Sequence, residues 1–328
     1  MTSPQSAPSR VDASVVVCTY NRARSLRKTL ASLVAQQVCG NVRWELLVVD
    51  NNSRDDTAEV VNEFAARPPW IQYCFEPKQG LSHARNHGIS VARGDVILFT
   101  DDDVLPEPDW VQRIVDGMAA TGCDACGGFI APIWECSPPS WLTDRFHGFL
   151  AVRAGRNDTF AIGPEDELPY GANMAFVRSV FERFGPFDVT RGRKGSVLAS
   201  GEDGELFERI RSSGGRIMFF GDARVHHAVE AFRLDKRYFR RWRYQTSRNL
   251  AESRGFQGRR RVSGVPLYLF PQLVRASGRA LVAAVRDPPD EAFQKEIIVW
   301  HFLGSIAGLW RSRSAPATPR EDRSTRAG

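Results

Sequence analysis

A short apolar strand followed by an amphipathic helix is the pattern of the first third of the chain, and it occurs four times in succession. Each strand segment is a short run rich in β-branched or aromatic residues, and each segment after it carries apolar residues at helical spacing. Successive units of this kind build a mostly parallel sheet with helices on both faces. We therefore predict a Rossmann-like, doubly wound α/β fold. The units are "SVVVCT" before "YNRARSLRKTLASLVAQQ", "WELLVVD" before "SRDDTAEVVNEFAAR", "IQYCFE" before "GLSHARNHGISVAR", and "GDVILFTD" before "EPDWVQRIVDGMAA".

Polar residues follow three of these strands directly, at the place where doubly wound sheets bind ligands. The first strand is not followed by the glycine fingerprint of a dinucleotide site, because "CTYNRAR" contains no glycine. This disfavours nicotinamide chemistry. The residues after the strands are Thr19, Tyr20, Asn21 and Arg22, then Asp50, Asn51, Asn52 and Ser53, and then Asp101, Asp102 and Asp103.

The acidic triplet Asp101 to Asp103 is costly at the end of an apolar strand, because like charges this close cannot all ionise freely. A divalent cation would neutralise them, since Mg²⁺ and Mn²⁺ prefer oxygen ligands and are commonly held by one or two carboxylates plus substrate phosphates. Acidic runs are also common in solvated loops and at helix N-termini. The triplet alone does not decide between these interpretations.

Seven segments together resemble glycosyltransferase family 2, an inverting group with the GT-A fold. Their order and spacing match the family over most of residues 13–245. The resemblance implies a GT-A domain over 13–230, with a nucleotide-binding half at 13–120 and an acceptor half at 121–230. It also implies a nucleoside-diphosphate sugar as donor, with a UDP-sugar favoured, and Mn²⁺ or Mg²⁺ as cofactor. The segments are "VVVCTYNR", "LLVVDNNSRDDT", "GLSHARNHGI", "DVILFTDDDV", "YGANMAF", "SGEDGELFERI" and "VHHAV".

The same resemblance implies a donor site built on the strand ends. Asp50 would accept hydrogen bonds from a uracil-like ring, unless it caps the next helix. Arg85 would lie beside the nucleotide, unless it pairs with a surface carboxylate. Asn stands in "DNNS" where many relatives have Gly, which we expect to affect loop geometry more than chemistry. The implied nucleotide-sugar residues are Thr19, Tyr20, Arg22, Asp50, Asn52, Arg85, Asp101 and Asp102.

For the metal, the resemblance implies Asp103 and Asp101 as ligands, with Asp102 serving either the metal or the donor. Family members often carry a histidine after the last core strand that reaches the metal. His226 and His227 are both candidates here. We favour His227 because alternate strand residues share one face and because its spacing to Arg233 is closer to that of the family. A strand histidine can equally be a satisfied polar residue without a ligand.

On the acceptor side, the resemblance implies that Asp203 in "GED" is the general base and that Glu202 orients or binds the acceptor. Both acids would also be favoured by the dipole at a helix N-terminus. Gly171, Ala172 and Asn173 match the acceptor segment, where small residues allow close approach of the chain.

Outside these motifs, the proline-containing stretch 127–168 predicts a long irregular loop or lid. Residues 231–311 predict a basic helix and two amphipathic helices near 265–285 and 291–310. We expect these last two to lie on an anionic membrane surface, with packing onto the core and membrane spanning as the alternatives. Residues 1–12 and 312–328 are expected to be disordered.

The absence of a secretory signal and the net charge of +6 predict a cytoplasmic protein, peripheral on the inner face of the cell membrane. Nucleic-acid binding is disfavoured, because only the basic, aromatic stretch 233–248 suggests it. We therefore predict an inverting transferase that acts on a lipid-linked or saccharide acceptor in cell-envelope or exopolysaccharide synthesis. The alternatives are a non-catalytic nucleotide-sugar binding module and a nucleotidyltransferase, whose usual Gly-rich phosphate loop is missing.

Overall fold

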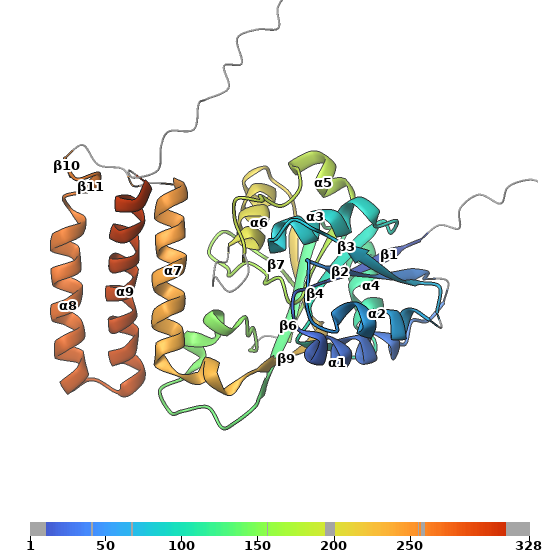
Figure 1. The fold of residues 1–328 in the computed structure, drawn as a ribbon, viewed down its shortest axis with the longest axis horizontal. Helices are drawn as coiled ribbons and strands as arrows, with labels where there is room; N and C mark the ends of the chain where they lie inside the picture. The colour runs from blue at the N-terminus through green and yellow to red at the C-terminus, as the bar shows by residue number, and fades with distance from the viewer. Residues whose placement is uncertain are drawn as a thin grey trace, which may run out of the picture. The chain divides into compact units, whose positions relative to one another are not determined.

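The protein was analysed as a computed structural model that describes residues 11–40, 42–66, 68–155, 157–193, 201–254, 256 and 260–312. The chain divides into two compact units, Met1–Leu234 and Asp235–Gly328, and Figure 1 shows the fold of each. The disordered arm and tail that we predict lie outside the described residues, apart from 11–12 and Ser312.

All four predicted strand and helix pairs form in the first unit. Their helices are amphipathic; α1, for example, buries Leu26, Leu30 and Leu33, which are four and three residues apart. The pairs are β1 (Ala13–Thr19) with α1 (Ala23–Val34), β2 (Trp44–Asp50) with α2 (Thr57–Ala65), β3 (Ile71–Phe75) with α3 (Leu81–Val91), and β4 (Val96–Asp101) with α4 (Trp110–Thr121).

The central sheet begins with these four strands in the order β3-β2-β1-β4, all parallel. Beyond β4 the order continues β8-β6-β9-β5, where β6 and β9 are parallel and the other neighbours are antiparallel. The predicted α/β fold with helices flanking a mostly parallel sheet is confirmed. The added strands are β5 (Val104–Pro106), β6 (Ala125–Trp134), β7 (Phe160–Ala161), β8 (Met174–Val177) and β9 (Ile217–Val229), with β7 pairing to β9.

Helices cover both faces of the sheet, as Figure 1 shows. Along β1, Val15 and Val17 face one apolar cluster with α1, α2 and α4, while Val16 faces the other. That second cluster contains α3, α5 (Ser179–Phe184) and α6 (Glu202–Ser212). The run of apolar residues in β1 is therefore explained by burial on both sides. This double layer leaves the ends of the strands as the place for polar side chains.

The irregular loop predicted for 127–168 is wrong at its start, because residues 127–134 belong to β6. Pro132 favoured the loop interpretation because proline is rare inside strands. It is tolerated because β8 pairs with β6 only at 125–127. Nearer Pro132, the described residues pair with that edge of β6 only through the isolated bridge of Ile130 with Arg153. The remainder contains a 3-10 helix, Asp144–Leu150, and the short strand β7.

In its described residues, the second unit contains three helices and a small hairpin. The helix α9 (Pro289–Ser312) packs against both α7 (Lys236–Arg254) and α8 (Leu269–Arg286). The predicted C-terminal helices are thus present, and α8 and α9 pack within their own unit. The part of the chain that the structure describes contains no helix with the length and apolarity needed to traverse a bilayer. The hairpin consists of β10 (Arg261–Val262) and β11 (Val265–Pro266).

Candidate active site

The ends of β1, β2 and β4 bring the predicted donor residues to one edge of the sheet. Thr19 pairs in register with Asp50, and Cys18, one residue earlier, pairs with Asp101. The side chains of Thr19 and Asp50 are buried, whereas that of Asp101 is 37% exposed. The convergence that the strand order predicts is therefore present, and Asp101 is the member that solvent reaches.

Asp50 is held as a fixed hydrogen-bond acceptor. Its Oδ1 accepts from the Ser53 backbone N–H at 2.8 Å, and its Oδ2 accepts from the Tyr73 hydroxyl at 2.9 Å. Burial, together with this hydrogen bond to Asp50, raises the pKa of Tyr73 to about 12, so the phenol stays protonated and keeps donating at neutral pH. Asp50 does not cap the next helix, because Asp56 occupies the N-cap of α2.

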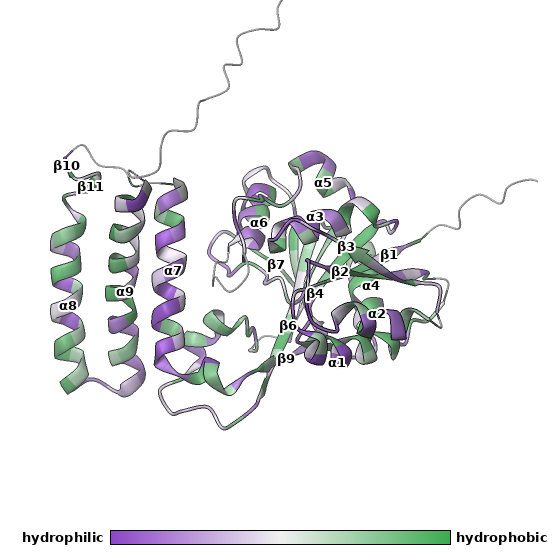
Figure 2. Ribbon diagram, viewed as in Figure 1, coloured by the Kyte–Doolittle hydropathy of each residue, from purple (hydrophilic) through white to green (hydrophobic). Residues whose placement is uncertain are grey.

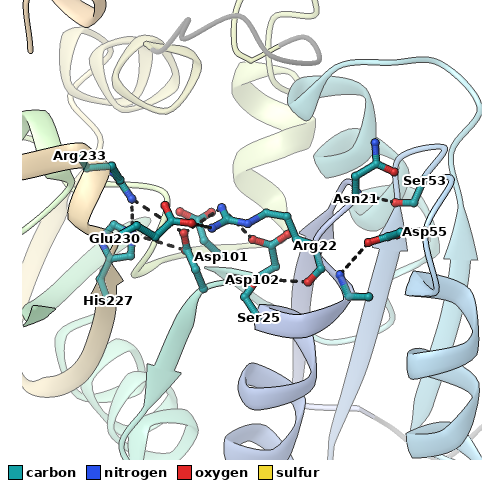
Figure 3. Close-up of polar contacts among 12 residues, drawn as sticks. Asn21, Arg22, Ser25, Ser53, Asp55, Asp101, Asp102, His227, Glu230 and Arg233 are labelled. Carbon is teal, nitrogen blue, oxygen red and sulfur yellow. Dashed lines mark hydrogen bonds and ion pairs between the residues drawn. The ribbon is translucent and has the colours of Figure 1, made fainter. Parts of the chain in front are cut away.

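Two left-handed asparagines shape the loops after β1 and β2. Asn21 has φ 52° and Asn52 has φ 65°, a region that asparagine tolerates better than most non-glycine residues. Asn52 thus adopts a backbone conformation that glycine would also supply. The Asn21 side chain accepts from the Arg54 N–H at 2.7 Å, and the Asn21 N–H donates to the Ser53 hydroxyl at 2.9 Å, which ties the two loops together (Figure 3). The partly buried Tyr20 precedes Asn21 in this loop.

Arg22 neutralises part of the acidic triplet, as Figure 3 shows. Its Nη1 lies 2.9 Å from Asp103 Oδ2 and 3.5 Å from Asp102 Oδ1, and its Nη2 lies 3.3 Å from Glu230 Oε1. Burial alone would lower the pKa of Arg22, but these carboxylates outweigh it and raise the pKa. Burial also raises the pKa of Asp102, which Arg22 opposes. The guanidinium therefore offsets part of the negative charge that these carboxylates bring to this end of the sheet.

His227, not His226, faces the acidic triplet. Its Nε2 lies 3.4 Å from Asp103 Oδ1, and the side chain is buried. His226 is partly exposed and lies 3.1 Å from Glu107 Oε1 instead. The alternation along β9 thus separates the two histidines as the strand period requires.

Asp103 is the most strongly compensated carboxylate of the triplet. Arg233 Nη1 lies 4.0 Å from its Oδ2 and 3.3 Å from His227 Nε2. Burial would raise the pKa of Asp103, but His227, Arg22 and Arg233 hold it well below its usual range. This carboxylate is therefore ionised throughout the neutral range and available as a ligand.

The donor set at this end of the sheet fits a hard divalent cation. Asp101 and Asp103 offer carboxylate oxygens, and His227 offers an imidazole nitrogen beside Asp103. Within the described ranges, no group of three or more His, Cys, Asp or Glu side chains is arranged so that it could hold a metal ion without further ligands. Mg²⁺ and similar ions commonly keep positions for phosphate oxygens and water, so an incomplete protein set suits a metal that binds together with a diphosphate.

A buried arginine separates this donor side from the predicted acceptor side. Arg85 Nη1 lies 2.8 Å from Glu202 Oε1, and its Nη2 lies 3.9 Å from Asp101 Oδ1. The Arg85 guanidinium also stacks on Phe187, with 5.3 Å to the ring centroid. Burial and Asp203 raise the pKa of Glu202, and Arg85 lowers it. Glu202 is also buried. The alternative interpretation of Arg85, a pair with a surface carboxylate, therefore does not apply to its partner Glu202.

Asp203 lies in the first turn of α6, and backbone donors orient its carboxylate. Its Oδ2 accepts from the Gly171 N–H at 3.0 Å, and its Oδ1 accepts from the Gly204 N–H at 2.8 Å. Unlike Glu202, it remains partly exposed. Asp203 therefore has the accessibility that a general base requires, and Glu202 has the fixed pairing of a positioning residue.

Gly171 is required where it stands, because a Cβ there would lie 2.1 Å from Arg85 Nη2. Gly171→Ala is expected to displace Arg85 and to reduce transfer by roughly 100-fold, the scale of loss that a 1 Å misplacement can cause. Gly204→Ala is the matched control, since nothing lies within 4 Å of a Cβ there and alanine favours a helix. Steady-state transfer rates of Gly171→Ala and Gly204→Ala test this prediction. Equal rates would contradict the need for glycine at position 171.

The two residues after Gly171 make hydrogen bonds that stabilise the fold. The Ala172 carbonyl accepts from the Thr100 hydroxyl at 2.9 Å. The Asn173 amide donates to the Phe129 and Ala223 carbonyls and accepts from Trp110 Nε1, so all of its described hydrogen bonds hold the sheet where β6 shifts register against β9. Of the three predicted acceptor-side residues, only Gly171 contacts Asp203.

Comparison with known families bears directly on this arrangement. The profile described as "Glycosyl transferase family 2" matches residues 14–185, which is over half of the chain and includes every predicted donor residue. The chain belongs to glycosyltransferase family 2. This membership confirms the resemblance drawn from the seven sequence segments.

Family 2 relatives of the chain act in polysaccharide and lipid-linked glycan synthesis. The glucosyl-dolichyl phosphate glucuronosyltransferase of Haloferax volcanii is 29% identical over 68% of this chain and 71% of its own. The succinoglycan biosynthesis protein ExoM of Rhizobium meliloti is 31% identical over the same shares. A mannosyltransferase from Pyrobaculum calidifontis, solved with GDP-mannose and Mn²⁺, is similar in fold, with a TM-score of 0.60 and 20% identity over 92% of this chain and 88% of that one. The chain is therefore a family 2 glycosyltransferase with the GT-A fold.

Sequence reasoning missed Glu230 as a site residue and used Arg233 only to choose between two histidines. Both lie just beyond β9 and contact the donor side through Arg22 and Asp103. Their position one and four residues after the strand end was the available signal, because polar residues after a core strand are where a site is expected.

Proposed function

We propose that the protein is an inverting glycosyltransferase that moves a sugar from a nucleoside-diphosphate sugar, preferably a UDP-sugar, to a lipid-linked or saccharide acceptor. The observation that carries this proposal is the division of the acidic groups by Arg85. Its Nη2 lies 3.9 Å from Asp101 Oδ1, and its Nη1 lies 2.8 Å from Oε1 of Glu202, which is next to Asp203 in the sequence. A single displacement needs this separation, because the leaving group and the attacking hydroxyl lie on opposite faces of the sugar.

On the donor side, Asp50 would receive the N–H of the base, and Thr19, Tyr20 and Asn52 would line the nucleotide. Asp50 is fixed by Tyr73 and Ser53, and each carboxylate oxygen has a second lone pair for a ligand donor. Asp102 and Arg22 would then flank the diphosphate. The Pyrobaculum enzyme holds GDP-mannose, so the preference of this chain for UDP requires its own test.

Asp101, Asp103 and His227 would hold Mn²⁺ or Mg²⁺ together with the diphosphate. When bound, the ion would neutralise the charge that develops on the leaving diphosphate. Arg22 would release Asp103 and turn toward the phosphates, where its guanidinium can form paired hydrogen bonds. Its side chain is 28% exposed, so a ligand can reach it.

On the acceptor side, Asp203 would accept the proton of the attacking hydroxyl. The Gly171 and Gly204 N–H groups hold its carboxylate in one orientation. Glu202 would hold Arg85 in place and thereby fix the donor side and the acceptor side relative to each other. The acceptor itself would be a lipid-linked or saccharide glycan of the cell envelope, reached at the cytoplasmic face of the membrane. The names of the two relatives, which print glucosyl-dolichyl phosphate and succinoglycan, support a lipid-linked or saccharide acceptor.

Thermal unfolding with nucleotides tests the donor half of the proposal. With Mn²⁺ present, UDP at about 100 times its Kd is expected to stabilise the protein by about 2.7 kcal/mol, and GDP is expected to give a smaller shift. EDTA should remove most of the UDP effect. Asp103→Asn serves as the matched variant, because it should lose the Mn²⁺-dependent part while keeping the fold. A UDP shift that EDTA and Asp103→Asn leave unchanged would contradict metal-assisted donor binding.

A further inference from the structure

The helix α8 exposes an apolar stripe on the side opposite to its packed face. It buries Leu269, Ala276 and Ala283, which are seven residues apart and share one face. The other side exposes four large apolar side chains to solvent. They are Val274 at 71%, Leu281 at 72%, Val282 at 53% and Val285 at 88% exposure.

A stripe of arginines runs beside these apolar residues. At 100° per residue, Arg275, Arg279 and Arg286 fall on one exposed strip of the helix, and Val282 lies between this strip and that of Val274, Leu281 and Val285. No acidic residue occurs anywhere in α8. The outward side of this helix is therefore apolar and uniformly cationic.

This pattern differs from that of the other helices of the unit. Figure 2 shows α7 as mainly hydrophilic, whereas α8 carries hydrophobic turns along its length. The neighbouring helix α9 covers the buried face of α8 but leaves the apolar stripe uncovered. An apolar stripe flanked by arginines is the arrangement that lies in the head-group region of a bilayer, with the apolar side chains among the acyl chains and the guanidinium groups at the phosphates.

We propose that this exposed side of α8, called here the α8 face and made of Val274, Leu281, Val282, Val285, Arg275, Arg279 and Arg286, binds the surface of an anionic lipid bilayer. The positive charge of the α8 face favours an anionic lipid surface over a second copy of the chain, because two α8 faces in contact would bring like charges together. That this binding serves to reach a lipid-linked acceptor rests on the proposed function. The binding itself does not.

Vesicle sedimentation of the full chain, without donor or acceptor, tests the proposal. The protein is expected to bind vesicles of phosphatidylcholine mixed with phosphatidylglycerol, to bind phosphatidylcholine alone much less, and to be released as salt rises. Leu281→Asp should weaken binding by at least about tenfold, because a buried leucine is lost from the bilayer. The double variant Arg275→Gln, Arg279→Gln should weaken it by roughly fivefold for each arginine.

The matched control is Val34→Asp, which makes the same kind of change at a 42% exposed position of α1. It should bind vesicles as the unmodified protein does. Absence of binding to anionic vesicles would overturn the proposal, and so would equal binding by Leu281→Asp. Light scattering tests the alternative partner, which is a second copy of the chain. A dimer that Leu281→Asp converts to a monomer would make the α8 face a contact between copies. Because no nucleotide is present, these outcomes are independent of whether the protein transfers a sugar.

Discussion

Arg85→Met is expected to lower the free energy of unfolding by about 3 to 5 kcal/mol and to abolish glycosyl transfer. Both Arg85 and Glu202 are buried, and their charged groups lie 2.8 Å apart. Removal of the guanidinium leaves the Glu202 carboxylate buried without its partner, which costs far more than the pair contributes. It also removes the group that lies between Asp101 and the acceptor side.

Thermal or urea unfolding measures the first effect, which should appear as a loss of roughly 10 °C in Tm. The double variant Arg85→Met, Glu202→Gln should recover most of the stability, because no buried charge remains unpaired, but it should stay inactive. Arg27→Met is the control, since its pair with Glu63 is exposed and its loss should leave unfolding unchanged. Equal stability of Arg85→Met and Arg27→Met would contradict the role given to Arg85.

Much of the donor half could be predicted because it depends on local patterns and one topological rule. The four strands and helices follow from apolar periodicity, and parallel strands place their carboxyl ends at one edge. Thr19, Asp50 and Asp101 therefore had to converge, as they do. The choice of His227 over His226 follows from strand alternation together with the spacing to Arg233, and the contact with Asp103 agrees with it.

The second half of the domain resisted prediction because its contacts are between segments distant in sequence. The antiparallel strand β8 lies between β4 and β6, an order that no local pattern encodes. Gly171, Ala172 and Asn173 are adjacent in sequence yet make unrelated contacts, with Asp203, Thr100 and Trp110 respectively. The pairing of Arg22 with Glu230, 208 residues later, likewise depends on tertiary structure.

Asp203→Asn is expected to reduce the turnover number by at least about 100-fold, within the range that general base catalysis contributes. The amide keeps the size of the side chain but cannot accept the acceptor's proton. The effect on stability should be small, about 1 kcal/mol or less, because the change removes one favourable charge from the first turn of α6.

Glu205→Gln is the matched control for that charge, since Glu205 also lies in the first turn of α6 and pairs with Arg209 at 2.9 Å. If Asp203 and Glu205 acted only by their favourable interaction with the helix dipole, the two variants would lose the same activity. We expect Glu205→Gln to retain most of its turnover, which would separate catalysis from helix stabilisation.

The most direct measurement of the central claim compares donor binding and turnover in one preparation of Asp203→Asn, saturated with donor, Mn²⁺ and acceptor. A division of labour between the donor side and Asp203 predicts an unchanged Kd for the nucleotide and a loss of turnover of at least about 100-fold. Turnover equal to that of the unmodified protein, with donor and metal bound, would contradict it.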